Sequence, residues 1–201
     1  MNTPSHLLVN AFVRQRIMAN GKMTIPRSAI LLGAVMPDIP LTLLWIGAYI
    51  YTRYIQGNQA ITLMDDQFDQ QYFTNPFWIA SHNMMHAPLI LLLMLALLWR
   101  FHAQPSGRGL WWFWFAAGCL IHTTLDIPTH ADDGPLLFFP LEWSIRFHSP
   151  ISYWDPNYFG REFTFFELAL NLVLLAYLGV PWLRKQLRKR ADRIVKPEQP
   201  S

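Results

Sequence analysis

Four long apolar stretches alternate with polar connections along this 201-residue chain. They run from Ser28 to Tyr51, from Phe77 to Trp99, from Leu110 to Ile127 and from Phe163 to Leu183. Because a bilayer core requires about 20 residues of helix, these lengths favour transmembrane helices. The first stretch is interrupted at Pro37–Asp38, so we expect a broken helix there. The pattern predicts an all-α integral membrane bundle of about four transmembrane helices.

The segment before the first apolar stretch, residues 1–27, is predicted to contain a separate helix. Ser5 is a suitable N-cap, and the apolar residues of the first two turns would share one face. We expect this helix to lie along the membrane or to dip into it rather than to cross it. One polytopic membrane domain over residues 28–183 and a basic tail over residues 184–201 account for the rest of the chain.

The composition supports a membrane environment. Hydrophobic residues make up 52% of the chain and charged residues only 14%, whereas a soluble domain has about a quarter charged residues. The single cysteine, Cys119, excludes an intramolecular disulfide. The net charge of +3 comes from basic residues that cluster at the ends of the apolar stretches. This placement indicates a role in membrane topology, and we expect no nucleic-acid partner.

The distribution of Lys and Arg predicts the orientation. Basic residues precede the first apolar stretch, lie between the second and third, and follow the fourth. The connection over residues 53–75 is acidic, and that over residues 128–162 has no basic excess. The positive-inside rule therefore predicts a multi-pass protein with both termini in the cytoplasm and both long connections outside.

Ionisable residues interrupt three of the apolar stretches, where each costs roughly 2.5–3.5 kcal/mol on insertion scales. Asp38 lies in the first, His82 and His86 lie in the second, and His122 and Asp126 lie in the third. Side chains four residues apart project from one face of a helix. Two such pairs facing each other beside Asp38 would supply imidazole nitrogens and carboxylate oxygens. That donor set suits Zn²⁺, Mn²⁺ or Fe²⁺ better than Ca²⁺ or Mg²⁺.

The depth of these residues agrees with a shared site. At a rise of about 1.5 Å per residue, they lie roughly 16 to 27 Å from the basic edge of their stretches. All of them therefore fall in the outer half of a hydrocarbon core that is about 30 Å thick. The alternative is a structural hydrogen-bond network between helices, which also uses His and Asp.

Three sequence motifs resemble a known family. They are GAVMPDIP, HNMMHA, and IHTTLDIPTH followed by GPLLFFPLEW. In this order they resemble the bacterial inner-membrane proteins classed as membrane-bound metal-dependent hydrolases, and the resemblance extends from Ser5 to about Asp155. That family is in turn distantly similar to zinc-dependent phospholipase C and the related zinc nucleases, which are helical enzymes with multi-zinc centres. The resemblance implies a location in the bacterial inner membrane.

The resemblance also implies roles for individual residues. The metal ligands would be His6, Asp38, His82, His86, His122 and Asp126. Asp126 could bridge two ions, and the centre would hold about one to three ions, with zinc the first choice and manganese or iron the alternatives. The segment THADDG adds His130, Asp132 and Asp133 as candidate catalytic residues, with an unligated carboxylate as general base.

The expected function is hydrolysis of a phosphoester or ester of a membrane lipid near the outer leaflet. Arg146 and Arg161 in the second outer connection could neutralise a lipid phosphate. The chain has neither His-Glu-x-x-His nor Gly-x-Ser-x-Gly, which are typical of zinc proteases and serine hydrolases. The alternative is a non-enzymatic metal or proton carrier or a scaffold, since intramembrane His and Asp residues also serve transport.

Overall fold

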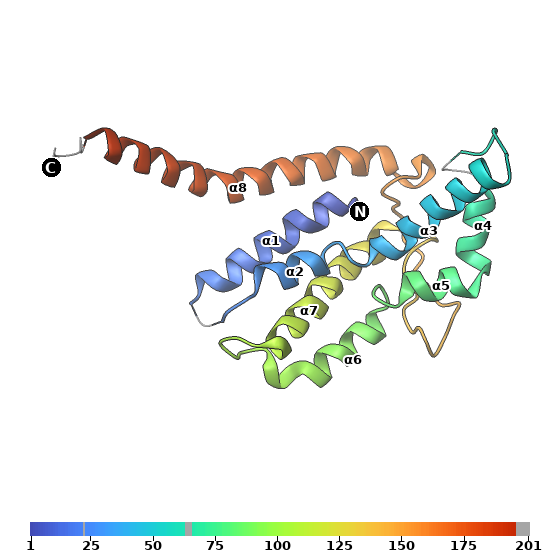
Figure 1. The fold of residues 1–201 in the computed structure, drawn as a ribbon, viewed down its shortest axis with the longest axis horizontal. Coiled ribbons are helices and arrows are strands. Elements are labelled where there is room, and N and C mark those ends of the chain that lie inside the picture. Colours follow the sequence, from blue (N-terminus) through green and yellow to red (C-terminus); the bar gives the residue numbers. More distant parts are fainter. Residues whose placement is uncertain (22, 63–65, 196–201) are drawn as a thin grey trace.

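The computed structural model describes residues 1–21, 23–62 and 66–195 of the chain. Over these residues the fold is all-helical and contains no strand, which confirms the all-α part of the predicted fold class (Figure 1). The main helices are α1 (Thr3–Ala19), α2 (Arg27–Gly33), α3 (Asp38–Ile50), α4 (Asp66–Thr74), α5 (Pro76–Asn83), α6 (Pro88–Leu98), α7 (Arg108–Asp126) and α8 (Gly160–Val195). Short helical turns extend α3, α6 and α7 and precede α8.

One helix segment, residues 160–181 of α8, is long and apolar enough to cross a membrane by itself. Two bent helix pairs also qualify if each pair forms one span. They are α2 with α3 and its extension, bent by 52°, and α5 with α6 and its extension, bent by 42°. The helix α7, expected as the third span, does not meet the same criterion. The number of four spans therefore stays a prediction.

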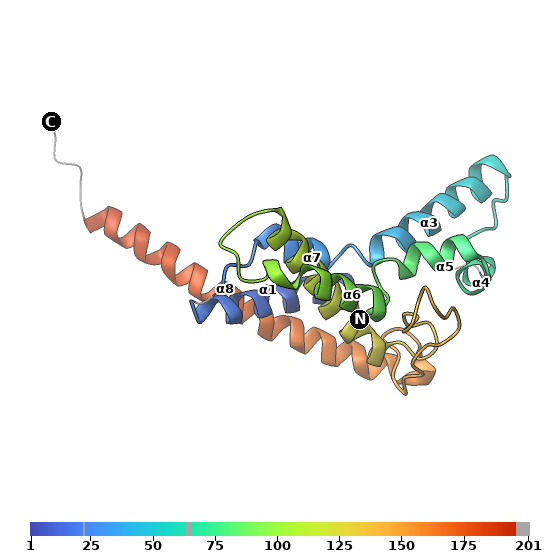
Figure 2. The ribbon, with the colours of Figure 1, turned by 90° about the horizontal axis from the view of Figure 1, so that it is seen from below.

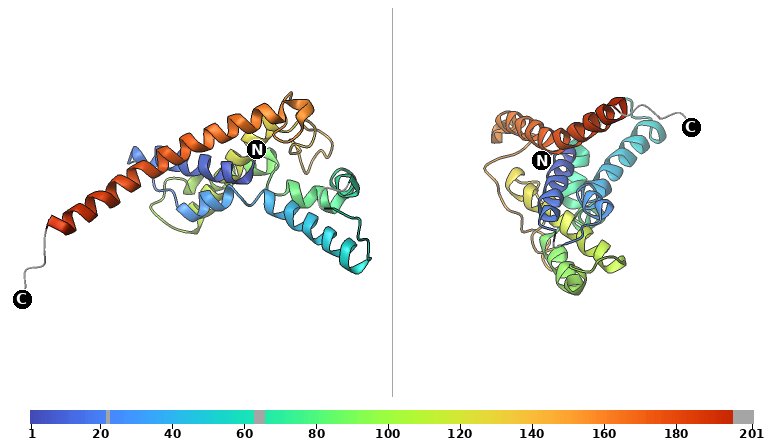
Figure 3. Two further views of the ribbon diagram at one scale, coloured as in Figure 1. Left: turned by 90° about the horizontal axis from the view of Figure 1, so that it is seen from above. Right: turned by 90° about the vertical axis from the view of Figure 1, so that its left-hand side faces the viewer.

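The helix α1 packs inside the bundle against α2, α7 and α8 (Figure 3). Its buried residues are the polar Ser5, His6 and Asn10, whereas Leu7 and Leu8 remain partly exposed. The prediction that Ser5 caps this helix is wrong. Asn2 occupies the N-cap position, and the Ser5 hydroxyl accepts a hydrogen bond of 2.8 Å from Asn171 on α8.

The helices α1, α2 and α7 approach one another closely at two glycines, Gly33 and Gly118. A Cβ added to Gly118 would lie 2.7 Å from the carbonyl oxygen of Ile30 and 3.2 Å from the side chain of Asn10. The buried amide of Asn10 uses this proximity, because it donates to the carbonyls of Ile30 (3.0 Å) and Gly118 (3.1 Å). One polar side chain of α1 thus joins the other two helices.

The second apolar stretch does not form the continuous helix that we expected. The helix α5 ends at Asn83, and α6 begins at Pro88 after a turn that contains His86. Pro88 has no backbone N–H and its ring opposes helical continuation, so the break follows from the sequence. The buried side chain of Asn83 stabilises the chain at this break, since its Oδ1 accepts a hydrogen bond of 2.8 Å from the backbone N–H of Leu136.

The long connection between α7 and α8 wraps around one end of the bundle (Figure 1). The helix α7 ends at Asp126, and the turn Ile127–Thr129 follows it, so Pro128 ends the helix instead of only kinking it. His130 therefore lies beyond the helix. Arg146 fastens the connection to α4 by donating to the hydroxyl of Tyr72 at 2.9 Å. It also donates to the carbonyl of Gly134 within the connection.

The helix α8 continues to Val195, beyond the other helices of the bundle (Figure 2). The basic segment after residue 183 is therefore helical up to residue 195, and residues 196–201 lie outside the described part of the chain. Both α1 and α8 run from the end of the bundle with the long connection toward the opposite end (Figure 1). The N-terminus lies near the middle of the molecule, and the basic segment of α8 extends beyond the other helices at the opposite end from the long connection (Figure 1).

We predict that Gly118→Ala destabilises the protein by about 1–3 kcal/mol, because its methyl group would overlap the backbone of α2. The measurement is thermal unfolding of the purified protein in detergent. Gly47→Ala is the matched control, since nothing lies within 4 Å of a Cβ at that position on α3. Equal melting temperatures for Gly118→Ala and wild type would contradict this packing.

Candidate metal centre

Four of the predicted ligands converge at the centre of the bundle. One nitrogen or oxygen atom from each of Asp38, His86, His122 and Asp126 lies within 4.8 Å of the other three. Asp38 begins α3, His86 lies in the turn between α5 and α6, and the other two residues lie one turn apart near the end of α7. The three histidine and aspartate motifs of the sequence therefore meet at one site.

The break between α2 and α3 orients His122. Asp38 donates its backbone N–H to Val35 and not to Ala34, so the carbonyl of Ala34 is available. It lies 2.8 Å from Nδ1 of His122, and because a carbonyl only accepts, Nδ1 must carry the hydrogen. The other ring nitrogen, Nε2, then faces the two carboxylates. Such an outer hydrogen bond is the usual support of a metal-binding histidine.

Nε2 of His122 lies 2.9 Å from Oδ2 of Asp126 and 3.3 Å from Oδ1 of Asp38. A lone pair and two carboxylate oxygens repel one another at such distances. Either a proton on Nε2 or a cation between these atoms is needed to hold the arrangement together. All three side chains are buried or half-buried, so water does little to screen this repulsion.

The carboxylate of Asp126 is the hub of the cluster and is only 1% exposed. Nε2 of His86 lies 2.9 Å from its Oδ2, while Nε2 of His6 and the amine of Met1 lie 3.0 and 2.9 Å from its Oδ1. The ring of His6 also stacks on that of His122 with centroids 3.7 Å apart. His6 therefore contacts the cluster directly but lies outside the group of four, and its role as a metal ligand stays a prediction.

His82 lies behind His86 and outside the group of four. Its ring centroid is 4.5 Å from that of His86 and 5.3 Å from that of Tyr72. The side chain is buried, and its Nδ1 has no hydrogen-bond partner among the residues that the structure describes. Since α5 ends between the two histidines, they do not project in parallel from one helix face, and only His86 reaches Asp126.

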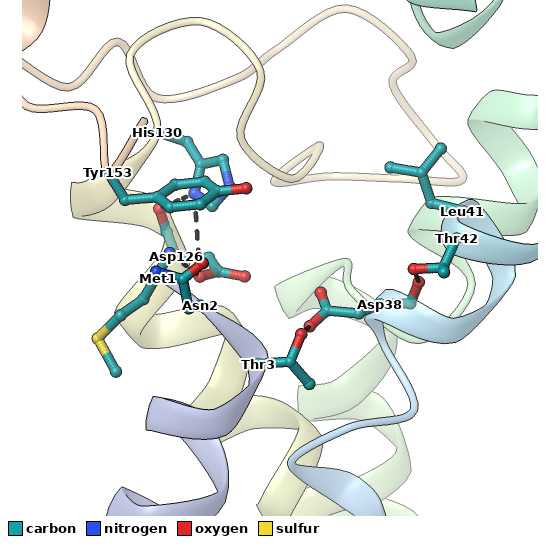
Figure 4. Close-up of a pocket in the computed structure, with 9 residues that line it drawn as sticks. All are labelled: Met1, Asn2, Thr3, Asp38, Leu41, Thr42, Asp126, His130 and Tyr153. Carbon is teal, nitrogen blue, oxygen red and sulfur yellow. Dashed lines mark hydrogen bonds and ion pairs between the residues drawn. The ribbon is translucent and has the colours of Figure 1, made fainter. Parts of the chain in front are cut away.

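A cavity of about 190 Å³ adjoins the cluster (Figure 4). Its lining is mostly polar and consists of Met1, Asn2, Thr3, Asp38, Leu41, Thr42, Asp126, His130 and Tyr153. Nδ1 of His130 lies 2.9 Å from the backbone carbonyl oxygen of Asp126. In the neutral ring Nδ1 is therefore the donor, and Nε2 carries the lone pair. Of the three residues predicted to be catalytic, His130 alone lines this cavity.

The other two predicted catalytic residues lie away from the cavity. Asp132 is exposed. Asp133 accepts a hydrogen bond of 2.9 Å from the indole of Trp154, and its backbone carbonyl accepts one of 2.6 Å from Tyr72. Burial raises the pKa of Tyr72 to about 12, against the opposing effect of Arg146. Tyr72 therefore remains a hydrogen-bond donor, and Arg146 ties the loop in place instead of facing the cavity.

Sequence reasoning missed a polar pair on α8 that holds the first turn of α1. Glu167 is 3% exposed, and its two oxygens accept hydrogen bonds from the backbone and side-chain nitrogens of Asn2 at 2.7 and 2.6 Å. Asn171, one turn along, bonds to Ser5. The signal was present as a glutamate and an asparagine four residues apart inside the fourth apolar stretch. These contacts hold the segment that carries His6.

Over the described residues, the fold and the site together define a helical protein with one apolar helix of membrane length, two bent helix pairs that could each form a span, and a buried His–Asp cluster. Over residues 1–187 the chain matches the family described as YdjM inner membrane protein, and it belongs to that family. This membership supports the predicted location in the inner membrane and the bacterial inner-membrane part of the resemblance. Comparisons with curated proteins and with solved structures gave no match.

The contact between Asn2 and Glu167 predicts an unusual pattern of mutant stabilities. Asn2→Asp keeps a good N-cap, but it places a second carboxylate against Glu167 and should cost about 1–3 kcal/mol. Adding Glu167→Gln should restore stability, because the glutamine amide can donate to the new carboxylate. The measurement is thermal unfolding in detergent at neutral pH.

Glu162→Gln on the exposed face of the same helix is the matched control for the loss of one charge. It should neither destabilise the wild type nor rescue Asn2→Asp. If the double variant Asn2→Asp, Glu167→Gln were as unstable as Asn2→Asp alone, the contact between α1 and α8 would not have the energetic role assigned to it.

Proposed function

We propose that this protein is a membrane-embedded, metal-dependent hydrolase that acts on a phosphoester or ester of a membrane lipid near the outer leaflet. The observation that carries the proposal is the convergence of two carboxylates and two imidazoles, with Nε2 of His122 directed at both carboxylates. Burying ionisable side chains inside a membrane protein costs free energy, and such residues usually have a function.

The donor set suits a transition-metal ion. Asp38, His86, His122 and Asp126 would hold it, and two nitrogens with two oxygens fit Zn²⁺, Mn²⁺ or Fe²⁺. When bound, such a cation supplies Lewis acidity, which makes water nucleophilic near neutral pH. Thr3 supports Asp38 by donating its hydroxyl hydrogen to Oδ2, so the carboxylate is held in a defined orientation.

The residues of the cavity can provide proton transfer and orientation. Because Nδ1 of His130 donates to the carbonyl of Asp126, Nε2 is available to accept a proton from water or to return one to a leaving group. Tyr153 packs on the ring of His130 with centroids 4.9 Å apart. The volume of 190 Å³ equals about six water molecules at ~30 Å³ each. It therefore suits a phosphate-sized head group, whereas acyl chains would remain in the membrane.

A second candidate function is a carrier or scaffold with a structural His–Asp network. It is favoured by the number of donors around Asp126, since the nitrogens of His6, His86 and His122 all lie within 3.0 Å of its oxygens. A buried carboxylate with three such partners can be stable without an ion. Metal analysis and hydrolysis assays together distinguish the two functions.

We expect the purified wild-type protein to contain about one or more zinc, manganese or iron ions per chain, measured by mass spectrometry in detergent without chelator. The double variant His122→Ala, Asp126→Ala should lose the metal. His102→Ala is the matched control, because His102 lies outside the cluster, beside Trp99. A folded wild-type protein without metal would overturn the hydrolase proposal and favour the structural network.

We further expect hydrolysis of phospholipids in mixed vesicles, lost on chelation and restored by metal. His130→Ala should reduce kcat by about 10²–10⁴-fold, as for removal of a general base, and should leave the metal content unchanged. Release of phosphorylated head groups or fatty acids is the readout. Metal uptake into proteoliposomes without hydrolysis of any lipid would identify a carrier instead.

A further inference from the structure

The connection between α7 and α8 contains a small hairpin, residues 137–147, with an unusual surface. Five of its eleven residues are large, apolar and exposed, namely Phe138 (47%), Leu141 (82%), Trp143 (44%), Ile145 (45%) and Phe147 (45%). Single exposed apolar residues are common on proteins, but a group of them on one short segment marks an interaction surface. The hairpin lies outside the helices that could span the membrane.

The exposure is not a consequence of a loose loop, because the hairpin is held internally. The backbone of Leu137 donates to Ile145 at 3.0 Å. The carboxylate of Glu142 accepts two hydrogen bonds from Ser144, at 2.7 and 2.6 Å. The indole of Trp143 donates to the carbonyl of Pro140 at 2.9 Å. The polar groups at the tip are thus paired within the hairpin, and the apolar side chains are directed outward.

The base of the hairpin is fixed to the helices. Leu136 and Phe139 are buried against Ile79 and Ala87, and Arg146 is bound to α4 as described above. The two charged residues of the hairpin, Glu142 and Arg146, are therefore both engaged by neighbouring groups. An apolar, aromatic surface whose two charged side chains are already hydrogen-bonded to neighbouring groups fits a lipid boundary better than a polar protein partner.

The position of the hairpin along the bundle also favours a lipid boundary as its partner. The apolar segment of α8 has 22 residues, and at 1.5 Å each it extends about 33 Å, slightly more than the hydrocarbon core of about 30 Å. Gly160, its first residue, should therefore lie near one membrane boundary. The long connection occupies the same end of the bundle as the start of α8 (Figure 1). Tyr158 and Phe159, which precede Gly160, are also exposed aromatic residues.

We infer that the hairpin of residues 137–147 inserts into the lipid–water boundary of the leaflet at this end of the bundle. The exposed apolar side chains of the hairpin would then contact lipid. Insertion would hold the connection that carries His130 and Tyr153 at the level of the lipid head groups. The inference rests on the hairpin and on the membrane location, and it does not depend on whether the cluster binds a metal.

The test uses a fluorescent label on the tip of the hairpin. In the full chain with Cys119→Ala, which removes the single cysteine, Leu141→Cys is labelled with nitrobenzoxadiazole. The protein is placed in nanodiscs of phosphatidylethanolamine and phosphatidylglycerol at one chain per disc. We expect blue-shifted emission and quenching by lipids spin-labelled near the head group, at least about twofold stronger than for a label at Asp132→Cys, an exposed polar residue of the same connection.

Water-like emission at position 141, or quenching no stronger than at position 132, would overturn the inference. Blue-shifted emission without lipid quenching would also overturn it, because the hairpin would then contact protein. Ile145→Cys serves as a second labelling site if Leu141→Cys does not fold. Because no readout involves metal or hydrolysis, failure here is distinguishable from failure of the proposed function.

Discussion

The buried carboxylate of Asp126 is the constraint on which the rest of the structure depends. A charge with 1% exposure in an apolar bundle would be strongly destabilising without donors or cations around it. The chain supplies such groups from three directions, with His6 on α1, His86 from a helix break, and His122 one turn away on its own helix. The elements of the bundle therefore have to meet at this point.

The two helix breaks, before Asp38 and before Pro88, help to bring the polar side chains together around Asp126. A continuous helix would use the carbonyl of Ala34 internally, whereas the break before Asp38 leaves it available to orient His122. The break before Pro88 likewise turns His86 toward Asp126, and the carbonyl of His86 accepts a hydrogen bond of 3.0 Å from Thr123. Backbone groups released from helices in a buried apolar environment need partners. The partners here are the side chains that shape the site.

The helix α1 buries polar residues and leaves apolar ones partly exposed, which is the reverse of the pattern usual in water. In water an amphipathic helix would bury Leu7 and Leu8, but here the polar Ser5, His6 and Asn10 face the bundle. Lipid chains accept apolar side chains at little cost, while polar groups are costly to leave without partners. Asn10 and His6 are thereby placed where they join helices and complete the cluster.

The amino-acid sequence alone indicated a helical membrane protein and six candidate ligands that include Asp38, His86, His122 and Asp126, because ionisable groups within apolar stretches are rare and their helical spacing is visible locally. The family match supports the inner-membrane location inferred from the same pattern. Only the tertiary structure decided which candidates meet. It separated His82 from the cluster, it brought His130 but neither Asp132 nor Asp133 to the cavity, and it revealed Glu167. These outcomes depend on where helices end and which faces touch, and such long-range contacts leave little trace in the local pattern of a single sequence.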